Sequence, residues 1–98
     1  KADSVDMLKL VAAQLRASGE SIILVGGAEI EGKAVLLVMI SDDLIREKKL
    51  DAARMIREIS PEINGSGGGQ PFLAIAGGNK PSGIMSALKK ARDIIVNL

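Results

Sequence analysis

Apolar positions in the first part of the chain predict a helix followed by a β-hairpin. Helical spacing puts four apolar residues on one face of a segment that ends near 18–19: Val5, Leu8, Ala12 and Leu15. Two continuous aliphatic runs follow at 21–29 and 33–40, and the short glycine-containing segment between them is typical of a hairpin. Because neither run alternates, we expect both strands to be buried on both faces. Gly26 and Gly27 indicate a bulge or a close backbone approach within the first strand.

Helical patterns return after the hairpin. Ser41 is a typical N-cap, and the adjacent Asp42 and Asp43 suit the first turn of a helix, so capping explains these acids better than a metal or acid–base pair does. Residues 46–58 carry mixed charges of the kind found on a solvated helix surface, with Asp51 as a second helix start within them.

The clearest helix is the last one, which is expected to begin near Pro81. Its apolar residues repeat at the helical period: Ile84, Leu88, Ala91, Ile95 and Leu98. We expect Met85 and Ala87 to widen the buried side. Lys80 lies just before this helix, where a cation opposes the helix dipole, so it is a candidate ligand for an external anion.

A glycine-rich stretch, 64–78, connects the middle of the chain to the last helix. Its four closely spaced glycines precede Pro71 and the apolar run 72–76, a pattern that predicts a loop followed by a short buried strand. Such a loop is either a flexible connector or a surface whose bare N–H groups meet a phosphate or a base. Neither the P-loop nor the dinucleotide-binding glycine pattern is present.

These patterns together predict an α/β fold. The chain of 98 residues is long enough for one modest core. We therefore expect a single small domain, with a mixed β-sheet of a hairpin plus a third strand, packed by about four helices.

Composition removes several classes of chemistry. The chain has no cysteine and no histidine, which excludes disulfides, thiolate nucleophiles, Cys/His zinc sites and the usual general base. Its one aromatic residue, Phe72, cannot form the rows of stacking side chains that read single-stranded bases. The apolar runs are too short to span a bilayer. The first residue is Lys1 rather than methionine, so we expect a piece excised from a longer protein.

Charge is distributed unevenly, although the net charge is only +1. Residues 1–64 hold nine basic and eleven acidic side chains, whereas residues 65–98 hold four basic and one acidic. An anionic partner is therefore expected to meet the glycine-rich end of the chain first.

The sequence GSGGGQP followed by FLAIAGGNKPSGIMSALKKARDII resembles the C-terminal domain of alanyl-tRNA synthetase. The shared features are a glycine loop ending in proline, a short strand ending in Ala-Gly-Gly, and a Pro-Ser start to the terminal helix. Here they are Gly65, Gly67, Gly68, Gly69, Pro71, Ala76, Gly77, Gly78, Pro81 and Ser82. The similarity continues upstream through the hairpin and the SDDL stretch, so it covers most of the chain.

The resemblance implies that residues 1–98 form the non-catalytic tRNA-binding C-terminal domain of a cytoplasmic alanine–tRNA ligase. Such a domain contacts the outer corner of alanine tRNA, and it assists aminoacylation and the editing of mischarged tRNA by other domains of the parent. The implied parent uses ATP, Mg²⁺ and Zn²⁺. No cofactor is expected in this fragment, which lacks the Cys and His ligands of the editing centre. A homodimer is a further partner hypothesis, and no membrane contact is expected.

Residue by residue, the resemblance places the nucleic-acid-facing loop at Gly67, Gly68 and Gly69. Gln70 follows where many family members carry arginine. The basic side chains expected to meet phosphates are Lys80, Lys89, Lys90 and Lys33. Phe72 replaces a polar residue of the family; we expect it in the core, whereas an outward ring would stack on a base pair of the tRNA corner.

Two other hypotheses remain open. The same domain family accompanies DHH-type phosphoesterases, RecJ-like exonucleases and oligoribonucleases, in which it binds substrate. Those enzymes typically place histidine after the glycines, where this chain has Gln70, so the synthetase hypothesis is favoured. A dimerisation or scaffold domain, using the exposed side of the first helix, is the third hypothesis.

Overall fold

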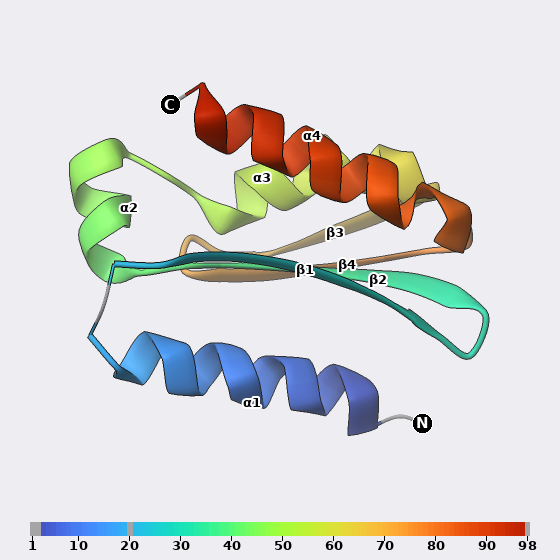
Figure 1. Cartoon of the computed structure of the whole chain (residues 1–98), viewed down its shortest axis with the longest axis horizontal. Helices are drawn as coiled ribbons and strands as arrows, with labels where there is room; N and C mark the ends of the chain where they lie inside the picture. The colour runs from blue at the N-terminus through green and yellow to red at the C-terminus, as the bar shows by residue number, and fades with distance from the viewer. Residues whose placement is uncertain (1–2, 20, 98) are drawn as a thin grey trace.

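The computed structural model describes residues 3–19 and 21–97, without the side chains of 3–8 and 16. Its elements follow in the order α1 (Asp3–Ala17), β1 (Ile23–Ile30), β2 (Lys33–Ile40), α2 (Asp42–Lys48), α3 (Ala52–Ile59), the 3-10 turn η1 (Ser60–Ile63), β3 (Gly65–Gln70), β4 (Leu73–Gly78), the 3-10 turn η2 (Pro81–Gly83) and α4 (Ile84–Val96). They form three layers, with α1 on one face of the sheet and α3 and α4 on the other (Figure 1). Within the described ranges, no helix is long and apolar enough to cross a bilayer.

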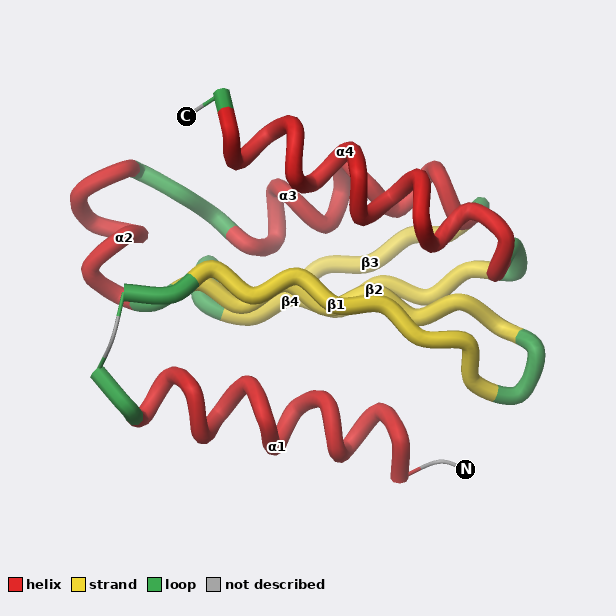
Figure 2. Tube along the Cα trace, viewed as in Figure 1, coloured by secondary structure: helices red, strands yellow, loops and turns green. Residues whose placement is uncertain are grey.

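The sheet has four strands in the order β1-β2-β4-β3, and every neighbouring pair is antiparallel. The α/β fold and its four helices confirm the expected class, but the described sheet contains one strand more than predicted and is antiparallel throughout rather than mixed, because β3 and β4 pair as a hairpin and β4 runs antiparallel to β2. The segment expected to be a glycine loop is β3, an edge strand paired with β4 from Gly65↔Gly78 to Gln70↔Leu73 (Figure 2). The two strands are joined by the two-residue turn Pro71-Phe72.

The predicted hairpin is confirmed by β1 and β2, which pair without interruption from Ile23↔Ile40 to Ile30↔Lys33. Gly27 therefore marks no bulge. A Cβ there would lie 2.8 Å from Cγ2 of Ile84, so this glycine allows α4 to approach the sheet closely.

Strand β2 forms the centre of the core. Leu36, Val38 and Ile40 point toward α3 and α4, whereas Leu37 and Met39 point toward α1. The expected burial on both faces is thus correct for β2. It is wrong for β1, whose residues are half-buried or exposed, because β1 is an edge strand.

A polar residue directly precedes each of α2 and α3. Ser41 occupies the N-cap position of α2, but its side chain does not cap the helix. Instead, the buried Ser41 Oγ accepts a hydrogen bond of 3.0 Å from the N–H of Ile22, which ties the start of β1 to the end of β2. Asp51 does cap α3, because its Oδ1 accepts a hydrogen bond of 2.9 Å from the N–H of Ala53.

Helix α4 buries Ala87 and Ala91, with Ile84, Leu88 and Ile95 partly buried against the same core. The predicted position of Leu98 falls outside the described residues. Met85 is 74% exposed, so its expected burial was wrong. Met85 is the residue after Ile84, so its side chain is rotated by about 100° around the helix axis from that of Ile84, and it points to solvent.

Candidate nucleic-acid interface

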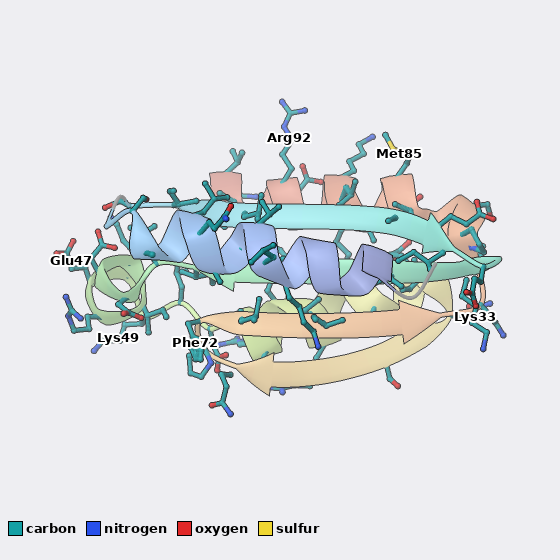
Figure 3. All side chains as sticks on the ribbon, turned by 90° about the horizontal axis from the view of Figure 1, so that it is seen from below. Lys33, Glu47, Lys49, Phe72, Met85 and Arg92 are labelled. Carbon is teal, nitrogen blue, oxygen red and sulfur yellow. The ribbon has the colours of Figure 1, made fainter. Side chains whose placement is uncertain are left out.

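The sheet face that packs against α1 is only half covered. Helix α1 covers β1 and β2 on this face, but it leaves β4 and β3 uncovered (Figure 3). Ile75 of β4 points toward the α1 side, and its register partner Gly68 and the pair Ser66↔Gly77 share that side. We call Ser66, Gly68, Ile75 and Gly77 the open glycine face.

Glycines in β3 alternate between two environments. A Cβ at Gly67 would lie 2.2 Å from the carbonyl oxygen of Ile75, and Gly65 and Gly69 meet the backbone of β4 at similarly short distances. These three positions therefore require glycine so that β3 can pair with β4 at all.

Gly68 and Gly77 have no such internal requirement. A Cβ at Gly68 would find nothing within 4 Å among the described atoms, and one at Gly77 would find only the Ala34 carbonyl oxygen, at 4.0 Å. Neither residue has the positive φ that excludes other side chains. Their bare surface leaves the sheet backbone accessible to an external group, which is the chemistry expected of a close nucleic-acid contact.

The edge position of β3 adds hydrogen-bonding capacity. An edge strand leaves alternate N–H and C=O groups without a strand partner on its outer side. Ser66 and Gln70 are both exposed on this strand. Backbone donors and two polar side chains therefore border the open glycine face.

Lysines lie at one end of this surface. Lys33, at the start of β2, lines a shallow groove of about 390 Å³ with Gly77 and Asn79. The neighbouring Lys80 is exposed, and its N–H donates to the carbonyl oxygen of Ile63 at 3.1 Å. Both lysines are thus available to an anion that approaches the open glycine face from this end.

Helix α1 contributes a basic residue that sequence reasoning missed. Ala13 lines a small cavity with Phe72 and Leu73, so this side of α1 faces β4. Lys9 precedes Ala13 by one helical turn and is exposed, which places it on the same side, along the border of the open glycine face. The sequence shows that Lys9 and Ala13 lie on the same side of a helix. It does not show that this side of α1 faces β4.

Phe72 occupies the turn between β3 and β4. The residue is half-buried, and with Ala12, Ala13 and Met39 it lines a cavity of about 70 Å³. The residue therefore lies at the rim of the smaller core beneath the sheet.

The remaining predicted lysines are not brought to the open glycine face. Lys90 Nζ lies 3.7 Å from a carboxylate oxygen of Glu62, an exposed pair of little energetic value. Lys89 lies on the outer surface of α4 beside Met85 and Arg92. This surface borders β1, the sheet edge opposite β3.

The chain is similar in sequence and in fold to proteins of a known family. The model of the "DHHA1 domain" matches residues 2–97. The chain belongs to the DHHA1 domain family. It is 45% identical over 92 residues to the alanine–tRNA ligase of Cytophaga hutchinsonii, and 45% identical over 89 residues to that of Levilactobacillus brevis. These alignments cover 94% and 91% of the chain but only 10% of each ligase.

A solved structure is similar to this DHHA1 domain over most of its length. It is the C-Ala domain from Aquifex aeolicus alanyl-tRNA synthetase, which superimposes with a TM-score of 0.79 at 25% sequence identity. The match covers 91% of this chain and 78% of that domain. The chain spans about a tenth of the curated relatives that it matches.

Acidic residues of the DHHA1 domain have structural contacts. Asp43 accepts a hydrogen bond from the hydroxyl of Ser21, and this bond, supported by one from Ser41, lowers the pKa of Asp43. Asp42 and Asp43 both lie in the first turn of α2, as predicted. Within the described part of the chain, no three acidic, histidine or cysteine residues are grouped as metal ligands.

Proposed function

We propose that this DHHA1 domain binds tRNA as the non-catalytic C-terminal domain of an alanine–tRNA ligase. In this role it contacts the outer corner of alanine tRNA while other domains of the parent attach alanine and edit mischarged tRNA. The alignment of almost the whole chain with alanine–tRNA ligases supports this proposal over a phosphoesterase. The observation that carries the binding role is the pair Gly68, which is half-buried, and Gly77, which is exposed: an added Cβ would have room at both positions, so neither has an internal reason to be glycine.

The open glycine face suits RNA recognised by shape and backbone. The absence of side chains at Gly68 and Gly77 lets a ribose, phosphate or base reach the sheet backbone, where edge N–H groups of β3 are donors. Lys9 and Lys33 border this face and neutralise phosphates on either side of the contact. Specific reading of a base sequence needs more side chains than this surface offers.

Weak binding by the isolated domain is consistent with this role. A net charge of +1 gives little long-range attraction to RNA. When the domain is tethered to a parent that holds the same tRNA elsewhere, its contact becomes intramolecular, and a weak site then contributes strongly to the total affinity. ATP, Mg²⁺ and Zn²⁺ would be bound by the rest of the parent, in the cytoplasm.

Matched charge reversals test the location of the interface. The double variant Lys9→Glu/Lys33→Glu is expected to weaken alanine tRNA binding at least about tenfold and to lower the slope of affinity against salt concentration, because phosphate contacts release counterions. The measurement is a fluorescence anisotropy titration at several salt concentrations.

The control variant, Lys89→Glu/Lys90→Glu, changes the net charge by the same amount on α4. It is expected to bind with an affinity close to that of the unmodified domain. A larger loss in the control than in the Lys9/Lys33 variant would move the interface to α4 and refute the assignment to the open glycine face.

A further inference from the structure

Helix α4 has a second row of side chains, on the side that faces away from the core. Met85, Lys89, Arg92 and Val96 are all exposed, and successive members of this row are four, three and four positions apart. This is the spacing of the a and d positions of a heptad, which places the four side chains along one line of a helix. Figure 3 shows Met85 and Arg92 projecting from α4 in the same direction. We call these four residues the outer stripe of α4.

Two shallow grooves run beside the outer stripe. The first has a volume of about 450 Å³ and lies over Met85, Leu88 and Arg92. The second, of about 290 Å³, is bounded by Leu88, Arg92 and Val96 of α4 and by two apolar residues of β1, Ile23 and Val25. Because Leu88 and Arg92 line both grooves, the grooves adjoin and form one surface along the helix.

The two ends of the outer stripe are apolar. Met85 is 74% and Val96 is 71% exposed, the two largest exposures among large apolar residues of the described chain. The half-buried Leu88 and Ile95 widen the stripe on the side of β1. Single exposed apolar residues are normal on a protein surface, but a row of them at helical spacing is typical of a helix face that packs against another helix.

The centre of the outer stripe is cationic. Lys89 and Arg92 lie between the two apolar ends, and no acidic residue lines either groove. Asp93 is the one acid of α4, and it is rotated by about 100° around the helix axis from Arg92. Neither cation forms an ion pair with another residue of the described chain. A complementary partner therefore has carboxylates opposite the centre of the stripe and apolar side chains opposite its ends.

These charges disfavour a second copy of α4 on the same stripe. Two outer stripes packed against each other would bring Lys89 and Arg92 of one helix against the same cations of the other, in a parallel and in an antiparallel arrangement alike. Charged residues at the contact positions of a helix pair cost stability and select an unlike partner. The helix that fits is therefore acidic.

The outer stripe is too small to hold a separate protein by itself. Met85 and Val96 are eleven positions apart. This corresponds to about 16 Å along a helix, and a docked helix about 10 Å wide would cover roughly 160 Å² in projection, whereas stable complexes bury about 800 Å² per partner. A contact within one chain is not subject to this limit, because the link between its two halves gives a high effective concentration.

We propose that the outer stripe of α4 docks an acidic amphipathic helix from the remaining part of the parent ligase. The inference rests on the proposed function, which supplies that parent; the DHHA1 domain spans only 10% of each related ligase. The docked helix is about three turns long, with apolar residues opposite Met85 and Val96 and carboxylates opposite Lys89 and Arg92. This contact fixes the direction in which the open glycine face points relative to the domains that act on the tRNA.

Zero-length crosslinking of the complete ligase tests the docking. A carbodiimide joins a lysine amine to a carboxylate in direct contact with it, and mass spectrometry of the peptides identifies both residues. Lys89 should crosslink to an aspartate or glutamate outside the DHHA1 domain. Arg92→Glu should lower the yield of this crosslink at least about tenfold, because it sets a like charge against the acidic helix.

Two controls accompany this experiment. Lys90 Nζ and a carboxylate oxygen of Glu62 lie 3.7 Å apart, so their crosslink is an internal standard that should be equally abundant in the unmodified and variant ligases. Arg57→Glu, the same charge reversal at an exposed site on α3, should leave the Lys89 crosslink unchanged.

The proposal is overturned if Lys89 crosslinks only within the DHHA1 domain or to a second copy of it, or if Arg92→Glu leaves the yield unchanged. The tRNA contact is tested separately on the isolated domain, where Arg92→Glu should bind alanine tRNA like the unmodified protein. Loss of the docked helix would therefore leave the RNA interface standing, and failure of the Lys9/Lys33 test would leave the crosslink unexplained by RNA.

Discussion

Replacing Gly67 by alanine is expected to destabilise the domain by about 3 kcal/mol, the upper part of the range for overpacking a tight contact. The new Cβ would lie 2.2 Å from the Ile75 carbonyl oxygen and 2.5 Å from Cα of Ala76. Both atoms belong to the backbone of β4 and cannot rotate away as a side chain can. The clash can be relieved only if β3 moves away from β4. That movement would also break the contact between β3 and α3. Urea denaturation followed by circular dichroism measures the loss.

The matched variant is Gly68→Ala, one residue along the same strand. Its Cβ would enter open space, and the loss of backbone freedom in the unfolded chain is expected to stabilise the domain by about 0.4–1 kcal/mol. An equal loss of stability in both variants would mean that β3 does not alternate between a packed and an open side. That result would remove the structural argument for the open glycine face.

Replacing Gly68 by leucine should leave the domain folded and weaken tRNA binding at least about tenfold, or 1.4 kcal/mol in binding free energy. The side chain would stand on the open glycine face and hold RNA away from the strand backbone. Leucine adds no charge, so the effect is steric and the salt dependence of the residual binding should be retained. Anisotropy titrations of both proteins against alanine tRNA measure the difference.

Ser86→Leu is the control for this experiment, because it adds the same side chain to the exposed outer surface of α4. Its affinity for tRNA should match that of the unmodified domain. Undiminished binding by Gly68→Leu would show that RNA does not approach this part of the sheet.

The sequence predicts the helices and the hairpin well because their side chains report the local structure. The aliphatic runs of β1 and β2, the N-terminal position of Asp51 and the period of α4 all carry a side-chain signal. Strand β3 carries none. Its composition, GSGGGQ, has neither alternating hydrophobicity nor β-propensity, and it is a strand only because β4 lies beside it. A tertiary contact thus decides the structure where local preference is weakest.

The candidate site was harder to predict for a related reason. Residues 67–70 were predicted as site residues through the resemblance, and the structure places them on the edge strand β3. Lys89 and Lys90 are closer to the glycines in sequence than Lys9 is. Helix α4 nevertheless places Lys90 beside Glu62 and Lys89 beside Met85 and Arg92, away from the open glycine face. Lys9 is remote in sequence but borders the site, because α1 covers only half of the sheet. Hydrophobic periodicity in the sequence identifies which side of a helix is buried. The order of the strands in the sheet decides which strands that side contacts.

The most direct test of the account is to map the tRNA contact on the ¹⁵N-labelled domain by NMR. On addition of alanine tRNA, the account predicts that amide signals of Ser66, Gly68 and Gly77 shift or broaden first, together with those of Lys9 and Lys33. Signals from the outer surface of α4, such as Lys89, should stay in place. Perturbations confined to α4, with the β3 and β4 amides unchanged, would contradict the central claim that RNA meets the open glycine face.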